Sequence, residues 1–290
     1  MDANLRNRLT YGPMLLAGLL AILLLDWWIE RATQVKGVGV LTLLVLMLPL
    51  ANLELARLFA AEHVRPYRFL SAAFGILIVA HAFCTQFEPF RPIAAGTLAL
   101  LVTAVPLAAA LRKAAGRTTE DAILKMAGTL LAAMYLGGLA WFLMALRVKE
   151  GLQEPRFVGT TMHVVMILLC VKFTDIGAFF TGKTIGRHKL IYWLSPGKTW
   201  EGLAGGVVTA ALVGAACSPF VEQLDWWKGA LFGAIIGAVG QAGDLLESLM
   251  KRDAQVKDSG TLLPGFGGVL DVIDSPLVAA PVAYLLFGLL

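Results

Sequence analysis

Charged residues gather in one short segment near the end of a chain that is otherwise very apolar. From Gly243 to Pro276 the sequence reads GDLLESLMKRDAQVKDSGTLLPGFGGVLDVIDSP, and an apolar run adjoins each end of this segment. Charges at the edge of a bilayer are costly to bury, so a dense cluster of both signs there indicates a functional site. The plainer interpretation, a solvated basic loop between two membrane helices, accounts for the Lys and Arg residues but not for the spacing of the acids.

The acidic residues at the start of this segment have helical spacing. If residues 240–252 form a helix, Asp244, Ser248 and Lys251 share one face, and Glu247 lies beside them. Two hard oxygen ligands and a cation then point the same way. The chemistry that these residues indicate is carboxylates for Mg²⁺ and Lys or Arg side chains for phosphate.

The second half of the segment combines a turn with further carboxylates. The sequence PGFGG at 264–268 cannot continue a helix and predicts a tight, mobile turn that lets the backbone approach a ligand closely. Asp271, Asp274 and Ser275 follow at the start of the last apolar run. The helix dipole favours carboxylates at that position, where they could hold a divalent cation.

A second polar region follows an apolar run that ends near residue 180. Lys172 and Asp175 lie deep in this run, either as a structural ion pair or facing a cavity, and we favour the cavity. The segment 181–202, TGKTIGRHKLIYWLSPGKTWEG, mixes basic residues with glycines. This composition suits a polyphosphate, because backbone N–H groups and cations can both reach it. The Gly-Lys-Thr triplets at 182–184 and 197–199 lack the spacing of a P-loop.

Together the two regions resemble the phosphatidate cytidylyltransferases, the CDP-diacylglycerol synthases. The later region matches that family's signature at Ser248, Lys251, Arg252, Lys257, Asp258, Ser259, Gly260, Pro264, Gly265, Gly267, Gly268, Asp271 and Asp274. The earlier region matches at 174–179, 186–190 and 195–202, with Gly197 at a frequent Lys. Phe266 and Val272 stand where the family usually has His and Arg. The match is close over about residues 160–290, whereas the first 155 residues match only as apolar spans.

The resemblance implies transfer of a cytidylyl group from CTP to phosphatidate, which gives CDP-diacylglycerol and pyrophosphate for phospholipid synthesis. It also implies Mg²⁺, with a monovalent cation such as K⁺ beside it. The residues expected to act in catalysis are Asp244, Asp271, Lys251, Lys257 and Asp258. Those expected to bind substrate are Asp175, Lys189, Ser195, Lys198, Thr199, Arg252, Ser259, Gly267 and Gly268. The expected metal ligands are Asp244, Asp271, Ser248 and Asp274.

Composition indicates a polytopic membrane protein. Of the 290 residues 58% are apolar and 15% are charged, whereas about a quarter of a soluble domain is charged. The three cysteines, at 84, 170 and 217, are scattered through apolar runs, which argues against a disulfide framework or a zinc site. The net charge of +4 without a basic tail gives no indication of nucleic acid binding.

We predict an all-α integral membrane protein with about nine transmembrane helices. The expected spans are about 13–30, 37–60, 68–87, 92–111, 122–146, 158–180, 202–222, 228–250 and 269–290. Glu54 and Arg57 in the second span are expected to form an ion pair near the interface rather than to line a cavity. Residues 1–155 would supply about five spans, and residues 156–290 the catalytic region with cytoplasmic motif loops at 181–202 and 251–268, all in one structural unit.

The distribution of basic residues predicts the orientation of these spans. With the N terminus in the cytoplasm, 16 Lys and Arg residues fall on the inner side and 7 on the outer side. Cytoplasmic loops carry the excess of Lys and Arg, so we expect an N-in, C-out topology. Both motif loops would then face the cytoplasm at a bacterial-type inner or plasma membrane, where nucleotides are present.

Three alternative functions remain in view. One is a CTP-dependent transferase that acts on another membrane lipid. A second is an inactive homologue with a scaffold role, suggested by Phe266 and Val272, although the retained carboxylates argue against it. A third is a transporter, which would have charges near the centre of several spans and internal repeats, whereas here the charge lies in two loops and the adjoining helix ends. The expected partners are CTP, phosphatidate and membrane lipids, with no nucleic acid, and a homodimer is left open.

Overall fold

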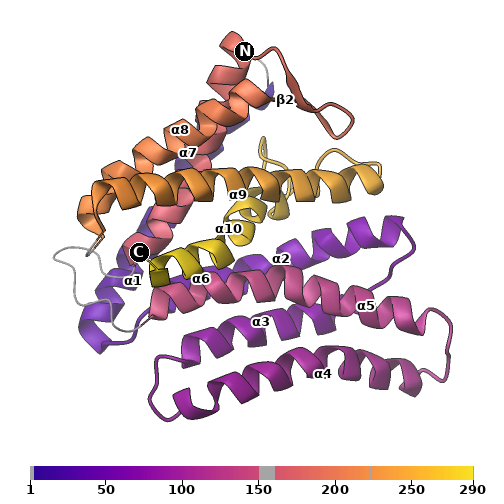
Figure 1. Cartoon of the computed structure of the whole chain (residues 1–290). Helices are drawn as coiled ribbons and strands as arrows, with labels where there is room; N and C mark the ends of the chain where they lie inside the picture. The colour runs from indigo at the N-terminus through magenta and orange to yellow at the C-terminus, as the bar shows by residue number, and fades with distance from the viewer. Residues whose placement is uncertain (1–2, 150–160, 222–223, 290) are drawn as a thin grey trace. The chain divides into compact units, whose positions relative to one another are not determined.

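The protein is a nearly all-helical chain (Figure 1). The computed structural model describes residues 3–149, 161–221 and 224–289. Its α-helices are α1 Ala3–Thr33, α2 Val38–Ala61, α3 Arg68–Cys84, α4 Ala94–Ala115, α5 Ala122–Ala133, α6 Leu139–Val148, α7 Thr161–Ile185, α8 Trp200–Cys217, α9 Trp226–Asp253 and α10 Leu270–Leu289. A π-helical turn, Met134–Gly138, joins α5 to α6, and two strands, β1 Lys189–Ile191 and β2 Ser195–Thr199, stand between α7 and α8.

Nine helical segments of the described chain account for the nine predicted spans. Eight are long and apolar enough to cross a bilayer, and the segment Ala122–Val148, which joins α5 and α6, is one of them. The ninth, α3, is apolar but only 17 residues long. The prediction of an all-α polytopic membrane protein is therefore confirmed. It could be made from the sequence because apolar runs of spanning length are a local property.

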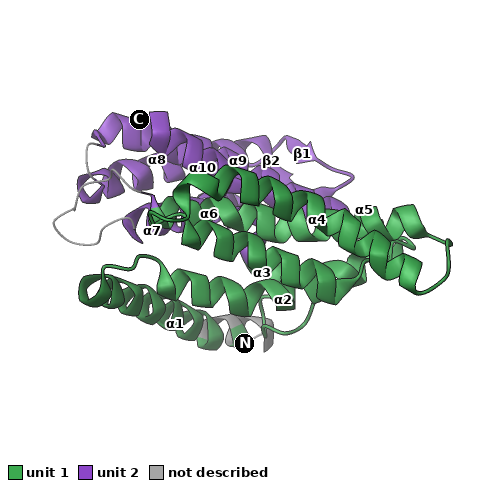
Figure 2. Ribbon diagram, turned by 90° about the horizontal axis from the view of Figure 1, so that it is seen from below, with its two compact units in different colours: residues 1–148, 253–272 green, residues 149–252, 273–290 purple. Residues whose placement is uncertain are grey.

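The chain forms two compact units, coloured separately in Figure 2. Unit 1 comprises Met1–Val148 with Asp253–Val272, and unit 2 comprises Lys149–Arg252 with Ile273–Leu290. The segment after α9 that carries the PGFGG turn therefore groups with the N-terminal helices. The hairpin β1–β2 groups with α7, α8 and α9.

In unit 1, α3 packs against α2, α4, α5 and α6. A close approach occurs at Gly137 of the π-helical turn, where a Cβ atom would collide with the backbone of Gly75 in α3. A π-helical turn bends a helix, and here it lies where two glycines let the backbones meet. The two glycines therefore allow close contact between α3 and the π-helical turn.

A buried ionic group also holds unit 1 together. Arg147 of α6 is fully buried, with its Nε 2.8 Å from Asp26 Oδ2 and its Nη2 2.6 Å from Glu30 Oε2, both in α1. Asp26 also accepts the N–H of Gly39 at the start of α2. A buried guanidinium is tolerated only when it is paired in this way, so the group fixes α1 and α2 against α6.

In unit 2, α7 and α8 lie in close contact along their lengths. Small residues allow this: a Cβ atom at Gly205 or Gly206 of α8 would collide with Thr181 or Thr174 of α7. Close helix packing through small residues is typical of membrane helices.

The hairpin was not predicted, because segment 181–202 was expected to be a loop. In the structure α7 continues to Ile185, the two strands pair antiparallel with Lys189 opposite Thr199, and α8 begins at Trp200. Thr199 caps α8, and its Oγ1 accepts the N–H of Gly202 at 3.0 Å.

Candidate active site

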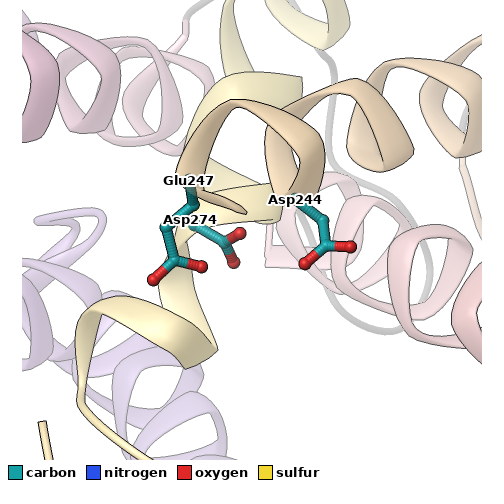
Figure 3. A group of neighbouring side chains, drawn as sticks. All are labelled: Asp244, Glu247 and Asp274. Carbon is teal, nitrogen blue, oxygen red and sulfur yellow. The ribbon is translucent and has the colours of Figure 1, made fainter. Parts of the chain in front are cut away.

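Three carboxylates meet in unit 2. Asp244 and Glu247 project from α9 and Asp274 from α10 (Figure 3). One ligand oxygen from each lies within 4.8 Å of the others. Asp244 is half-buried, whereas Glu247 and Asp274 are only 1% and 2% exposed. This group, the acidic cluster, is the one set of His, Cys, Asp and Glu in the described residues that is placed to hold a metal ion.

Lysine side chains lie beside the acidic cluster. Lys251 lies 3.2 Å from Glu247 one turn along α9, which confirms the predicted helical spacing. Lys198 forms an ion pair with Asp244. The Oδ2 atom of Asp274 is buried and accepts no hydrogen bond. Closely packed carboxylates repel and a buried anion is costly, so positive charge beside the cluster is stabilising.

The β1–β2 hairpin brings basic residues to α9. Lys198 of β2 is the residue that reaches Asp244. Lys189 of β1 points back along the hairpin and donates to the carbonyl oxygen of Pro196 at 2.8 Å. At the start of α8, Glu201 accepts the N–H groups of Arg187 and His188 and lies 2.5 Å from His188 Nδ1. The hairpin is thus shaped by local hydrogen bonds that leave Lys198 directed at the acidic cluster.

A pocket of about 300 Å³ lies beside this ion pair in unit 2. Its lining includes five predicted site residues, Asp175, Ser195, Lys198, Thr199 and Asp244. Asp175 accepts a 2.7 Å hydrogen bond from Nε2 of Gln241 in α9, which also lines the pocket. Asp175 therefore faces a cavity, as we favoured from the sequence. Gln241 was missed, although an amide within an apolar span needs a hydrogen-bond partner and is itself a signal.

The PGFGG turn in unit 1 has the tight geometry predicted for it. Gly265 and Gly267 have positive φ angles of 84° and 97°, and Leu263 and Gly267 form an isolated β-bridge. A Cβ atom at Gly267 would collide with the carboxylate of Asp271. Only glycine fits this backbone without strain, so the sequence of the turn follows from its shape.

Asp271 organises the same turn. Its Oδ2 accepts the N–H groups of Gly268 at 2.7 Å and of Ser259 at 3.0 Å, and it also lies 3.0 Å from the Ser259 hydroxyl. Asp271 belongs to unit 1, whereas the acidic cluster is in unit 2. A role for Asp271 and Ser248 as metal ligands stays a prediction.

Glu54 of α2 is a residue of this region that sequence reasoning misplaced. The expected ion pair with Arg57 is wrong, since among the described residues no cation lies within ion-pair distance of Glu54. Its carboxylate is 5% exposed and accepts the N–H groups of Val269 at 3.1 Å and Leu270 at 2.8 Å. The Ser259 hydroxyl lies 3.2 Å away. Glu54 therefore caps the start of α10 from a distant helix.

The remaining predicted residues are more open. Arg252, Lys257 and Asp258 are exposed, and Ser248 is half-buried on α9. The ring of Phe266, at the position where the family usually has His, is half-buried near Gly12 of α1. These surroundings leave the three charged side chains accessible to a ligand.

The described chain thus combines helices of membrane-spanning length with a compact set of carboxylates and with lysines that pair with two of them. The chain belongs to the Cytidylyltransferase family, whose family model matches residues 7–290. The family expected from the two sequence regions is thereby confirmed.

Known relatives point the same way. The chain is 38% identical to the phosphatidate cytidylyltransferase of Synechocystis sp. over 54% of its own length and 60% of the relative's. It is 40% identical to the phosphatidate cytidylyltransferase of Bacillus subtilis over 55% and 57%. It is 39% identical to the uncharacterized protein YnbB of Escherichia coli over 54% and 50%. The chain spans about half the length of the curated relatives it matches.

Proposed function

We propose that this protein transfers a cytidylyl group from CTP to phosphatidate and so forms CDP-diacylglycerol and pyrophosphate. The observation that supports this most directly is the ion pair between Lys198 and Asp244. In this ion pair Lys198, which lines the pocket and which we propose to bind phosphate, meets Asp244 of the acidic cluster. Membership of the Cytidylyltransferase family supports the same reaction.

In this reaction the protein has to align CTP with the lipid phosphate, and it forms no covalent bond with either substrate. An oxygen of the lipid phosphate attacks the α-phosphorus of CTP. The bond from that phosphorus to the β-phosphate oxygen breaks, and pyrophosphate leaves. The lipid phosphate is already ionised at neutral pH, so no strong general base is needed. Positioning two polyanions and offsetting their charge supplies most of the catalysis in such phosphate transfers.

Each part of the pocket has a task in this proposal. Lys198 binds phosphate oxygens of the nucleotide, and the hydroxyl groups of Ser195 and Thr199 donate hydrogen bonds beside it. Asp175 fixes the amide of Gln241 and so shapes the pocket wall. Lys251, Arg252 and Lys257 add positive charge for the phosphates, and Lys189 stiffens the hairpin through its bond to Pro196.

The acidic cluster fits Mg²⁺. Its donors are hard carboxylate oxygens, which Mg²⁺ prefers, and the buried Oδ2 of Asp274 accepts no hydrogen bond from the described residues. Asp244, Glu247 and Asp274 would hold the ion, and the ion would offset the negative charge of the phosphates. Glu247 joins the predicted ligands on this evidence of proximity, and K⁺ remains an expectation from the family.

The experiment that tests this proposal is a transfer assay on the purified protein in detergent. Phosphatidate, CTP and Mg²⁺ are supplied, and pyrophosphate and CDP-diacylglycerol are both measured. We expect both products in equal amounts, their loss in Asp244→Asn, and normal rates in the control Asp225→Asn, which removes a carboxylate outside the pocket and cluster. Transfer to an isoprenoid alcohol or another lipid phosphate, with none to phosphatidate, would replace the proposed acceptor. No transfer by a folded sample to any lipid would refute an enzyme.

A further inference from the structure

Four arginines lie together in unit 1, and the proposed reaction does not use them. Arg57 is close to the end of α2, Arg65 and Arg68 are at the connection to α3, and Arg112 is close to the end of α4. All four side chains are exposed. We call these four residues the arginine site.

Two adjoining hollows run through the arginine site. The larger, about 560 Å³, is lined by Arg68, Arg112, Tyr67 and Phe69 among others. The smaller, about 290 Å³, is lined by Arg57, Arg65 and Arg68 among others. Arg68 and Pro66 line both hollows, so the two hollows adjoin, and between them they are lined by all four arginines. The excess of Lys and Arg in cytoplasmic loops would explain the charge of these four residues. It would not explain why they line two hollows, because that excess concerns charge alone.

Aromatic rings direct two of the guanidinium groups. The Cζ atom of Arg112 lies 5.4 Å from the ring centroid of Tyr67, and that of Arg68 lies 5.0 Å from the ring centroid of Phe69. Such contacts stabilise a guanidinium through its face. Its N–H donors point outward in the plane of the group, where they can bind the oxygens of a phosphate bidentately.

The arginine site has no internal counter-ion. In the part of the chain that the structure describes, no carboxylate lies within ion-pair distance of any of the four guanidinium groups. The acidic residues near the same helix ends, Glu62, Glu120 and Asp121, are exposed and do not pair with them. Four like charges around two shared hollows repel one another, so an anion bound between them would be stabilising.

The depth of the site in the membrane identifies the kind of anion. Arg57 and Arg112 are each about one turn from the end of a helix that is long and apolar enough to span a bilayer. The ends of spanning helices lie at the level of lipid headgroups. Next to the arginines, Phe69 and Leu111 are 74% and 73% exposed, which suits contact with acyl chains. Basic pockets between membrane helices in this position bind anionic lipid headgroups.

We propose that Arg57, Arg65, Arg68 and Arg112 form a binding site for an anionic phospholipid. The phosphate of the headgroup lies among the guanidinium groups and the acyl chains lie along Phe69 and Leu111. The site consists of other residues than the proposed active site, and the proposal does not depend on the proposed reaction.

The test is native mass spectrometry of the purified protein in detergent during titration with phosphatidylglycerol, with phosphatidylcholine as the zwitterionic comparison. We expect the wild-type protein to retain phosphatidylglycerol in preference. Arg112→Gln should weaken this binding roughly fivefold, and the double variant Arg68→Gln, Arg112→Gln roughly thirtyfold, because each interfacial cation contributes about equally. Arg117→Gln is the matched control. Arg117 is an exposed arginine that follows α4, the helix of Arg112, and it lines neither hollow.

The outcomes separate the proposal from its rivals. Equal retention of phosphatidylglycerol by the wild-type protein and the double variant overturns the site, and so does an equal loss in Arg117→Gln. Equal retention of phosphatidylcholine overturns recognition of an anionic headgroup. Displacement of the lipid by the same concentration of inorganic phosphate would show a site for free phosphate instead. Thermal unfolding of each variant without added lipid should match that of the wild-type protein, because the exchanged side chains are exposed.

Discussion

The carboxylate of Asp274 is buried at the start of α10, close to two other carboxylates and with one oxygen that accepts no hydrogen bond. Asp274→Asn should lower cytidylyl transfer roughly a hundredfold or more, because a ligand of the proposed Mg²⁺ is lost. Without Mg²⁺ the same variant should unfold at an equal or higher temperature than the wild-type protein, because it relieves repulsion within the acidic cluster.

Transfer rates and thermal unfolding, each with and without Mg²⁺, check both halves of this expectation. Asp253→Asn is the control, since Asp253 is an exposed carboxylate at the end of α9. If Mg²⁺ raised the unfolding temperature of Asp274→Asn as much as that of the wild-type protein, the assignment of Asp274 as a ligand would be wrong.

Lys198 belongs to the pocket and to an ion pair with Asp244 at once. We expect Lys198→Gln to raise the KM for CTP and to lower kcat/KM roughly a hundredfold, because a charge-assisted contact to phosphate is lost. Lys183→Gln removes a lysine of the same region whose side chain is exposed beside Phe179, and it should leave both constants near wild type. Steady-state kinetics with varied CTP would contradict the role of Lys198 if only the KM for phosphatidate changed.

Among the elements, α10 depends on a residue far away in the sequence. Glu54 of α2 accepts the N–H groups of Val269 and Leu270, which are 215 and 216 residues later. Glu54→Gln leaves only one acceptor oxygen and turns an amide group toward backbone donors. It should lower the free energy of unfolding by about 3 kcal/mol, the scale of hydrogen bonds to a buried charged group.

Thermal unfolding in detergent, with transfer activity measured below the transition, checks the role of Glu54. Glu62→Gln is a close control, because Glu62 follows α2 directly, is exposed and loses the same charge. A variant Glu54→Gln as stable and as active as Glu62→Gln would show that the contacts to α10 have no consequence.

The same element shows where sequence reasoning reaches its limit. The helices could be predicted because apolar runs of spanning length are local. The i+3 spacing of Glu54 and Arg57 is also local, and it suggested an ion pair that the structure does not form. The true partners of Glu54, Val269 and Leu270, are far away in the sequence, and no local pattern reports that contact. The β1–β2 hairpin was missed for a similar reason, since its short strands are fixed by Glu201 and by pairing rather than by apolar periodicity.

Within the candidate site the identities of the acidic residues could be predicted from the sequence, whereas the contacts between helices could not. Asp244 and Asp274 were expected as ligands from their type, their spacing and the family signature, and they lie together with Glu247. The Gln241–Asp175 hydrogen bond joins α9 to α7 and could not be inferred from either helix alone.

At the scale of the whole molecule, the charge distribution predicts that the N terminus and the hairpin lie on the cytoplasmic side. Single cysteines introduced by Arg187→Cys, before β1, and by Gln34→Cys, between α1 and α2, would test this. A membrane-impermeant maleimide should label residue 187 only from the cytoplasmic side and residue 34 only from the outside. The native Cys170 and Cys217 are buried, and the unsubstituted protein, which also contains Cys84, gives the background.

The labelling also tests two earlier proposals, the cytidylyl transfer to phosphatidate and the binding of an anionic phospholipid at the arginine site. In the N-in topology the connections α2–α3 and α4–α5 lie on the cytoplasmic side together with the hairpin. The reason is that an even number of membrane spans separates each of these connections from the others. The arginine site would then meet the cytoplasmic leaflet, whose surface is negatively charged. Labelling of residue 187 from the outside would invert this arrangement, remove the pocket from cytoplasmic CTP, and so contradict the proposed transfer on topological grounds alone.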